Sequence, residues 1–424
     1  MQHVQDESAA REPGETSSQC PVDHVAWSRQ KTAPVVEPVG LPVEHDAAGV
    51  WHVRGFGEAR AVLRSGDTKQ AGFGAPVFEK YSPEGKEIAG ILYKEGPGHH
   101  EQRRKTARFF TPKAVSANYR SLMEQQADML VADLQHEKQA DLSQIALAMA
   151  VRVASLVVGL TNSSQSGMTR RLEAFFENTT LVESGDSHLP RFIENLRFVW
   201  GQRRMTLFFL LDVKPAIKAR RRQLQDDVIS HLISQGYNDT DILTECVTYA
   251  AAGMVTTREF ISVATWHFLE QPELRERYLA APEEERYEML HEVLRLEPVV
   301  AHLLRRATAD VSLESNGASV TIPKGALMDV HIRATNADES IVGEHPLELC
   351  PGRALKGDNI PSMLMSFGDG HHRCPGAYIA IQETDILLQR LLAIKGLHME
   401  KAPTIRWNDI TAGYELRGLL LAVD

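Results

Sequence analysis

Apolar residues recur with helical spacing through most of the chain. The spacing predicts helices at about 99–108, 115–135, 141–160, 166–180, 188–211, 213–235, 238–270, 272–280, 283–296 and 375–392. Strand-like runs are short and mostly late, at 49–53, 311–313, 320–322 and 327–332. No internal repeat is visible. The predicted fold class is therefore mainly α with small β-sheets.

Three segments depart from this pattern. Residues 1–30 are polar and aperiodic, which predicts a flexible arm before a single domain at 31–424. Residues 68–98 are rich in Gly and Pro, as in loops that cover a functional site. The most apolar stretch, 145–160, is interrupted by Arg152 and is short for a membrane span. We therefore expect a buried helix there and no membrane anchor.

Charge and cysteine content narrow the class of protein. The formal net charge of -10 gives no basic surface for nucleic acid. The first 20 residues lack the basic and apolar regions of a secretory signal. The four cysteines, Cys20, Cys246, Cys350 and Cys374, lie far apart with no CxxC pair. We expect a cytoplasmic protein with reduced cysteines, one of which has a chemical role.

The segment around Cys374 holds the densest set of candidate functional residues. Gly368 and Gly370 precede it, Gly376 follows, and an amphipathic helix is predicted directly afterwards. A cysteine before a helix N-terminus is stabilised as a thiolate by free N–H groups and the helix dipole. Such a thiolate suits an iron centre, including haem.

Two other interpretations of this segment stay open at this point. The first is that Cys374 is a buried structural cysteine in a tight loop. Zinc bound by His371, His372 and Cys374 is the second, although these residues crowd together and lack a distant partner ligand. Cys350 begins the same Cys-Pro-Gly tripeptide, but no Gly-x-Gly precedes it and no long helix follows.

The Cys374 segment resembles the ligand loop of the cytochrome P450 superfamily, Phe-Gly-x-Gly-x-His/Arg-x-Cys-x-Gly. The matching residues are Phe367, Gly368, Gly370, His372, Cys374 and Gly376. The resemblance covers roughly residues 30–424 and implies the soluble bacterial type. It implies a triangular helical prism with small β-sheets, and haem b between a central helix and the cysteine loop. Cys374 would be the axial ligand of the iron.

Further motifs of that family occur in the expected order. Glu292 and Arg295 match its Glu-x-x-Arg helix and would form a buried pair on one helix face. By resemblance, His99 and Arg103, together with Arg305, would reach the haem propionates.

The segment 251–257 resembles the family's oxygen-binding helix. Gly253 would open a groove beside the iron, and Thr256 aligns with the threonine whose hydroxyl serves bound oxygen, although it could instead bond to its own helical turn. The family usually has an acid just before that threonine, where this chain has Val255. Glu259, three residues after Thr256, is the candidate replacement in proton delivery.

The resemblance implies a monooxygenase that inserts one oxygen atom from O2 into a hydrophobic small molecule. Because no nicotinamide-binding motif is present, a separate ferredoxin and its reductase would supply electrons, docking on Arg103, Arg104, Lys105, Arg108 and Arg373. We also expect a monomer. The residues expected to line the substrate pocket are Phe78, Ala252, Val255, Val299, His302 and Tyr414.

Three alternatives to that function remain open from the sequence. Val255 favours a haem-thiolate enzyme with atypical chemistry, such as peroxygenation, oxidative coupling or dehydration. A haem sensor or carrier without turnover is the second. A metal-free helical binding protein is the third.

Overall fold

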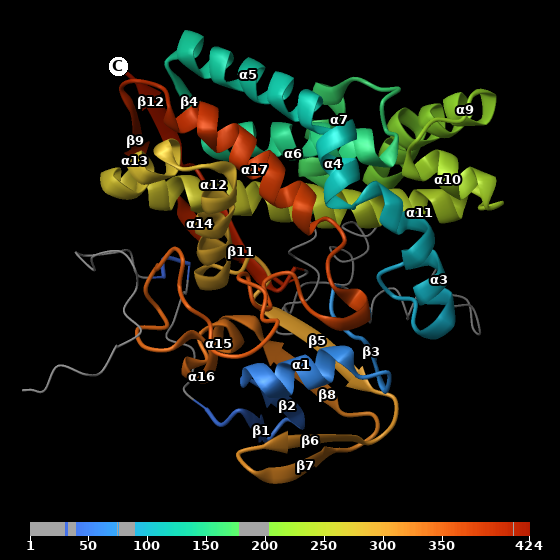
Figure 1. Ribbon diagram of the computed structural model, residues 1–424. Helices are drawn as coiled ribbons and strands as arrows, with labels where there is room; N and C mark the ends of the chain where they lie inside the picture. The colour runs from blue at the N-terminus through green and yellow to red at the C-terminus, as the bar shows by residue number, and fades with distance from the viewer. Residues whose placement is uncertain (1–29, 33–39, 74, 76–89, 178–202, 410) are drawn as a thin grey trace, which may run out of the picture.

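A computed structural model describes residues 30–32, 40–73, 75, 90–177, 203–409 and 411–424 of the chain. Its long helices form one half of the molecule and a five-stranded sheet lies in the other half (Figure 1). The arm predicted at residues 1–30 lies outside the described residues except for Gln30. The fold is mainly α with small sheets, as predicted.

Helices make up most of the described chain. The α-helices are α1 (Phe56–Arg64), α3 (Gly96–Thr106), α4 (Pro112–Asn118), α5 (Arg120–Glu137), α6 (Leu142–Val158), α7 (Gln165–Glu177), α9 (Lys214–Arg222), α10 (Val228–Ser234), α11 (Asp239–Ala250), α12 (Thr256–Glu270), α13 (Pro272–Ala280), α14 (Glu283–Leu296), α15 (Ile332–Asn336), α16 (Glu339–Val342) and α17 (Ala377–Leu392). Short 3-10 turns are η1 (Ala107–Phe109) and η5 (Gly370–His372), and π-helical segments are η3 (Phe209–Val213) and η4 (Ala251–Val255).

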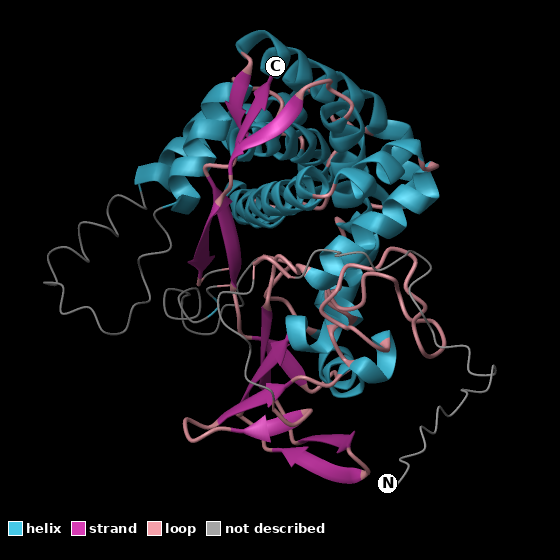
Figure 2. Cartoon of the chain, turned by 90° about the vertical axis from the view of Figure 1, so that its left-hand side faces the viewer, coloured by secondary structure: helices cyan, strands magenta, loops and turns pink. Residues whose placement is uncertain are grey.

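The strands form one larger sheet and three small ones, which Figure 2 shows in magenta. The larger sheet has the order β1-β2-β8-β5-β3, the second is β4-β12-β9, and β6-β7 and β10-β11 are hairpins. Their bounds are β1 (Val43–His45), β2 (Val50–Val53), β3 (Thr68–Gln70), β4 (Gln139–Asp141), β5 (His302–Ala307), β6 (Val311–Ser315), β7 (Ala318–Ile322), β8 (Leu327–His331), β9 (Leu397–Lys401), β10 (Thr404–Asn408), β11 (Gly413–Arg417) and β12 (Leu420–Val423).

Helix α6 lies at the centre of the helical half. It is apolar on nearly every face and packs against α5, α12 and η4, which explains the strongly hydrophobic run in the sequence around Arg152. Asp141 caps its N-terminus by accepting a hydrogen bond from the Ser143 N–H at 2.8 Å. Gly159 ends it in a left-handed conformation (φ 98°). None of the helices that the structure describes is long and apolar enough to cross a membrane.

The predicted Glu292–Arg295 pair is confirmed as a buried clamp. Arg295 donates to both carboxylate oxygens of Glu292, at 2.7 and 2.9 Å. Its remaining N–H groups reach the carbonyls of Asn336, Pro346 and Glu348. A planar guanidinium with five donors can hold several carbonyls at once, so this pair fixes the long loop that leads to the cysteine segment.

Several predicted boundaries differ from the structure. The helix expected at 213–235 is two helices. The chain is extended at Gln223, and the second helix begins after its N-cap residue, Asp227. The helix expected at 115–135 is divided near Tyr119. Strands β1, β3, β4, β5 and β9–β12 were not predicted, since short strands give little periodic signal. The helix expected at 188–211 lies largely outside the described residues.

Candidate active site

Cys374 lies in a tightly turned loop just before α17. Its N–H donates to the carbonyl of Phe367 at 2.9 Å, which closes the loop. Gly368 and Gly370 both have φ of +68°. A Cβ at Gly370 would lie 2.1 Å from the carbonyl oxygen of Leu63 in α1, so only glycine fits there. The glycines predicted from the sequence are therefore required by the loop.

The sulfur of Cys374 is accessible within a region that protein atoms otherwise surround. This surrounding raises the pKa of the thiol, whereas the N–H groups of Gly376 and Ala377 and the guanidinium groups of Arg103 and Arg373 lower it. The same donors favour the thiolate once a cation binds the sulfur, because they are already oriented toward it. An added Cβ at Gly376 would lie 3.8 Å from the sulfur.

Histidine side chains beside this loop gather around one carboxylate. The Nε2 atoms of His371 and His372 each lie 3.1 Å from Oε2 of Glu95, and the Gln70 N–H donates to Oε1 at 2.8 Å. The His99 ring lies 4.4 Å from the His372 ring, centroid to centroid. Glu95 was missed from the sequence; the available signal was an acidic residue at the N-cap of the helix that holds His99.

Two arginines complete this group. Arg103 in α3 donates to the carbonyl of Arg373, beside the cysteine. Arg305 in β5 is buried and donates to Gln70 and to the Leu304 carbonyl, and burial lowers its pKa to about 10. The structure thus brings His99, Arg103, Arg305 and His372 together from three separate segments, α3, β5 and the cysteine loop.

These residues fit the carboxylates of a haem. The Glu95 carboxylate is already held by donors of the kind that a propionate needs. Nδ1 of His99 is buried, and no hydrogen-bond partner for it exists in the described part of the chain. Burial lowers the pKa of His99 to about 3, so a further anion beside it would be favourable. A second carboxylate would satisfy that nitrogen.

The central helix has a π-helical interruption at η4, directly before Thr256. Such bulges are frequent at functional sites because they shift one turn of the helix. Thr256 donates its hydroxyl to the carbonyl of Ala252, within its own helix. A Cβ added at Gly253 would face Ala154 of α6, at 3.7 Å, whereas the groove expected beside the iron stays a prediction.

The proton relay predicted for Glu259 is not supported. Its carboxylate is buried and accepts from the Leu416 N–H at 2.7 Å, from Arg258 at 2.8 Å and from Arg417 at 2.8 Å. These bonds connect α12 to β11. A carboxylate that accepts from two guanidinium groups and a backbone N–H is occupied in holding the two elements together, so Glu259 is a correction to the catalytic assignment.

The predicted pocket residues differ in how far they are exposed to solvent. Ala252 is exposed on the central helix, and Val255 and Val299 are almost buried. Tyr414 is 1% exposed within the protein core, and its hydroxyl donates to the Glu297 carbonyl at 3.1 Å. Tyr414 therefore cannot contact a substrate there. Phe78 lies outside the described residues.

His302 is also misassigned as a pocket residue. Side chains alternate along a strand, so His302 and Arg305 in β5 point to opposite faces of the sheet. Nδ1 of His302 lies 2.9 Å from Asp329 Oδ1, on the face away from Arg305.

Zinc binding through Cys374 is not supported either. The rings of His371 and His372 turn toward Glu95, and Cys374 belongs to neither histidine–carboxylate group that the described residues form. Cys350 is disulfide-bonded, which contradicts the expectation of fully reduced cysteines.

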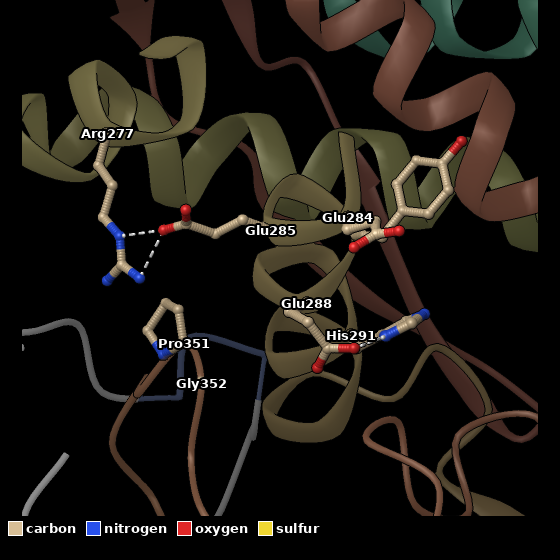
Figure 3. Close-up of a pocket in the computed structure, with 8 residues that line it drawn as sticks. Arg277, Glu284, Glu285, Glu288, His291, Pro351 and Gly352 are labelled. Atoms are coloured by element: carbon tan, nitrogen blue, oxygen red, sulfur yellow. Dashed lines mark hydrogen bonds and ion pairs between the residues drawn. The ribbon is translucent and has the colours of Figure 1, made fainter. Parts of the chain in front are cut away.

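A separate surface pocket of about 490 Å³ lies beside α14 (Figure 3). Arg277 pairs with Glu285 at its rim, and His291 with Glu288. None of the predicted site residues lines it, so it is distinct from the Cys374 region. The full lining is Arg277, Glu284, Glu285, Tyr287, Glu288, His291, Pro351 and Gly352.

Comparison with protein families decides between the interpretations. The family model described as "Cytochrome P450" matches residues 53–280 and 287–400. This chain belongs to the cytochrome P450 family. This P450 is 25% identical over 354 residues to the biotin biosynthesis cytochrome P450 of Bacillus subtilis, covering 81% of this chain and 82% of that one. It is also 25% identical to the mycinamicin IV hydroxylase/epoxidase of Micromonospora griseorubida, over 92% of both chains.

Solved structures agree on the fold. The crystal structure of CalO2 matches with a TM-score of 0.75 at 21% identity, over 90% of this chain and 93% of that one. P450BioI, solved in complex with hexadec-9Z-enoic acid ligated acyl carrier protein, matches with a TM-score of 0.71 at 21% identity, over 90% and 94%.

This P450 is a haem monooxygenase, and its cofactor is haem b. The resemblance stated from the sequence and the predicted fold are confirmed. Haem supplies oxygen activation at its iron, and a thiolate ligand donates electron density to that iron. Cys374 would be that ligand, and His99, Arg103, Arg305 and His372 would bind the propionates.

Proposed function

We propose that this P450 oxidises a hydrophobic small molecule, with electrons from a separate ferredoxin and ferredoxin reductase. The observation that supports this substrate class is the apolar character of the helix beside Thr256, where Ala252 is exposed and Val255 directly precedes the threonine. One similar P450 is named a mycinamicin IV hydroxylase/epoxidase, and another was solved in complex with hexadec-9Z-enoic acid ligated acyl carrier protein.

An exposed basic surface beside the cysteine loop supports the electron partner. Arg104, Arg108 and Arg373 are exposed, and α3 and the following turn hold the first two. An acidic ferredoxin would be steered to such a surface at low salt. Arg103, the fourth expected member, points inward to the Arg373 carbonyl, and Lys105 pairs with Glu101.

Charge reversal tests this docking surface. The double variant Arg104→Glu/Arg108→Glu should slow reduction by a ferredoxin at least tenfold at low ionic strength, and high salt should shrink the difference. Lys401→Glu in β9, exposed on another part of the surface, is the matched control. Equal reduction rates and salt slopes for wild type and the double variant would place the docking site elsewhere.

Peroxide-driven oxidation is the second candidate, because proton delivery lacks the usual acid. Val255 occupies the place of that acid, Glu259 is engaged with Arg258 and Arg417, and Thr256 donates to Ala252. A panel of hydrophobic compounds should be tested with hydrogen peroxide and with a ferredoxin system.

The variant Val255→Asp separates the two candidates. For the ferredoxin-dependent function, it should raise the amount of product formed per electron pair consumed, because an acid favours proton delivery. Faster turnover with peroxide and no gain from Val255→Asp would favour the second candidate. Val299→Asp, with an acid placed off the central helix, is the control.

A further inference from the structure

One face of the five-stranded sheet holds a histidine cluster that haem binding does not use. His52 in β2 is paired with Asp329 in β8, and His331 lies two residues further along β8. His302 in β5 is paired with His331. Paired residues, and residues two apart on a strand, point to the same face of a sheet. All four side chains therefore share the face opposite Arg305.

The atoms of three of these residues converge with the spacing of metal ligands. His52 Nδ1 lies 2.9 Å from His331 Nε2, His331 Nε2 lies 3.5 Å from Asp329 Oδ2, and His52 Nδ1 lies 3.9 Å from the same oxygen. The centre of that triangle is about 2.0 Å from all three atoms, which is the usual length of Zn–N and Zn–O bonds.

Partners outside the triangle orient two of the three ligands. Nε2 of His52 lies 3.1 Å from Asp46 Oδ2, and the other oxygen of Asp46 accepts from the N–H groups of Ala48 and Val50. A proton on Nε2 of His52 leaves the lone pair of Nδ1 directed into the triangle. Metal-binding histidines commonly donate their second N–H to a carboxylate in this way.

Asp329 is oriented too. His302 Nδ1 lies 2.9 Å from Oδ1 and 3.1 Å from Oδ2, so His302 holds the carboxylate in place, and Oδ2 is the oxygen that also lies near His52 and His331. The exposed fractions of the side chains are 8% for His331, 15% for Asp329 and 21% for His52. The cluster is therefore more buried than a solvated group of surface side chains.

The charge of the cluster also suits a cation. Asp46 and Asp329 give two carboxylates among the imidazoles, and the guanidinium of Arg54 nearby is paired with Glu44 at 2.6 Å. Two imidazole nitrogens with one carboxylate oxygen favour zinc or a similar transition metal, whereas calcium and magnesium prefer all-oxygen sites.

We propose that His52, Asp329 and His331 bind a divalent transition-metal ion of the zinc type, separate from the haem. The ion would connect β2 to β8 on the side of the sheet away from the cofactor. Three protein ligands leave a fourth position for water, and since the site joins two strands its effect would be structural.

Metal content of the haem-loaded chain, prepared without an affinity tag, tests the site. After chelator treatment and re-addition of zinc, we expect one zinc per chain in addition to the iron. His52→Gln and His331→Gln should each weaken zinc binding at least tenfold, and His136→Gln, on the exposed face of α5, should not change it. Equal zinc affinity in wild type and His331→Gln would overturn the proposal.

X-ray absorption at the zinc edge of the wild-type protein tests it without relying on folding of a variant. We expect nitrogen and oxygen neighbours at about 2.0 Å with the signature of two imidazoles. Sulfur at about 2.3 Å would overturn the assignment. So would zinc that is lost in His371→Gln and retained in His52→Gln, because the ion would then lie beside Glu95.

Discussion

Two histidine–carboxylate clusters lie on opposite sides of β5 and differ in what surrounds them. The cluster at Glu95, His371 and His372 has the buried guanidinium of Arg305 beside it. The cluster at His52, Asp329 and His331 has a second carboxylate, Asp46, instead. The same residue types therefore suit an anion in one place and a cation in the other. The neighbouring charges, rather than the histidines, decide which ligand fits.

Removal of the thiolate should have the largest effect on the haem side. In Cys374→Ala, we expect the strongly red-shifted Soret band of the reduced carbon monoxide complex to disappear, together with monooxygenase activity, because the axial ligand is lost. Cys246→Ala removes the other free cysteine, which is buried in the core, and should retain both. A red-shifted band in Cys374→Ala would exclude this residue as the ligand.

Removal of one cation from the Glu95 side should weaken haem retention. Arg305→Gln should release haem roughly tenfold to a hundredfold faster, as expected for the loss of a charge-assisted hydrogen bond in a buried site. Transfer of haem to excess apomyoglobin measures the rate. Arg306→Gln, next in sequence but on the other face of β5, should behave like wild type. If both variants lose haem equally, the face assignment is wrong.

Glu245 of α11 contacts α3, the helix that includes His99. Its carboxylate accepts from Gln102 of α3 at 2.8 Å and from the Ile91 N–H at 3.0 Å, and burial raises its pKa to about 7. Between pH 4.5 and 7 the folded chain keeps a proton that the unfolded chain has lost. The free energy of unfolding therefore falls as pH rises through this window.

Glu245→Gln removes that dependence. At pH 8 the variant should be more stable by about 3 kcal/mol, and well below pH 4.5 the difference should vanish. Thermal midpoints of the haem-loaded protein across this pH range provide the measurement, with Glu101→Gln on the exposed side of α3 as control. Parallel curves for wild type and Glu245→Gln would contradict the raised pKa.

The smallest expected effect concerns the outer partner of the proposed metal site. Asp46→Asn should weaken zinc binding by about tenfold, because the His52 tautomer is then less firmly set. Haem content should stay unchanged, since Asp46 lies on the other side of the sheet from Arg305. Loss of haem together with zinc would mean that the two clusters are not independent.

The sequence by itself determined the cysteine loop, the central helix and the Glu292–Arg295 clamp. These features depend on short-range spacing: glycines where the loop needs positive φ, a cysteine before a helix, and two side chains on one helix face. The residues predicted to bind the propionates came from the resemblance, since three distant segments contribute them.

Only the tertiary structure decided the roles of Glu259, His302, Tyr414 and the second histidine cluster. Glu259 shares a helix face with Thr256, but β11 supplies the donors that hold its carboxylate. His302 belongs to a strand that was not predicted, and a shift of one residue in strand register moves a side chain to the other face. His52, Asp329 and His331 are far apart in sequence, and the pairing of β2 with β8 alone brings them together.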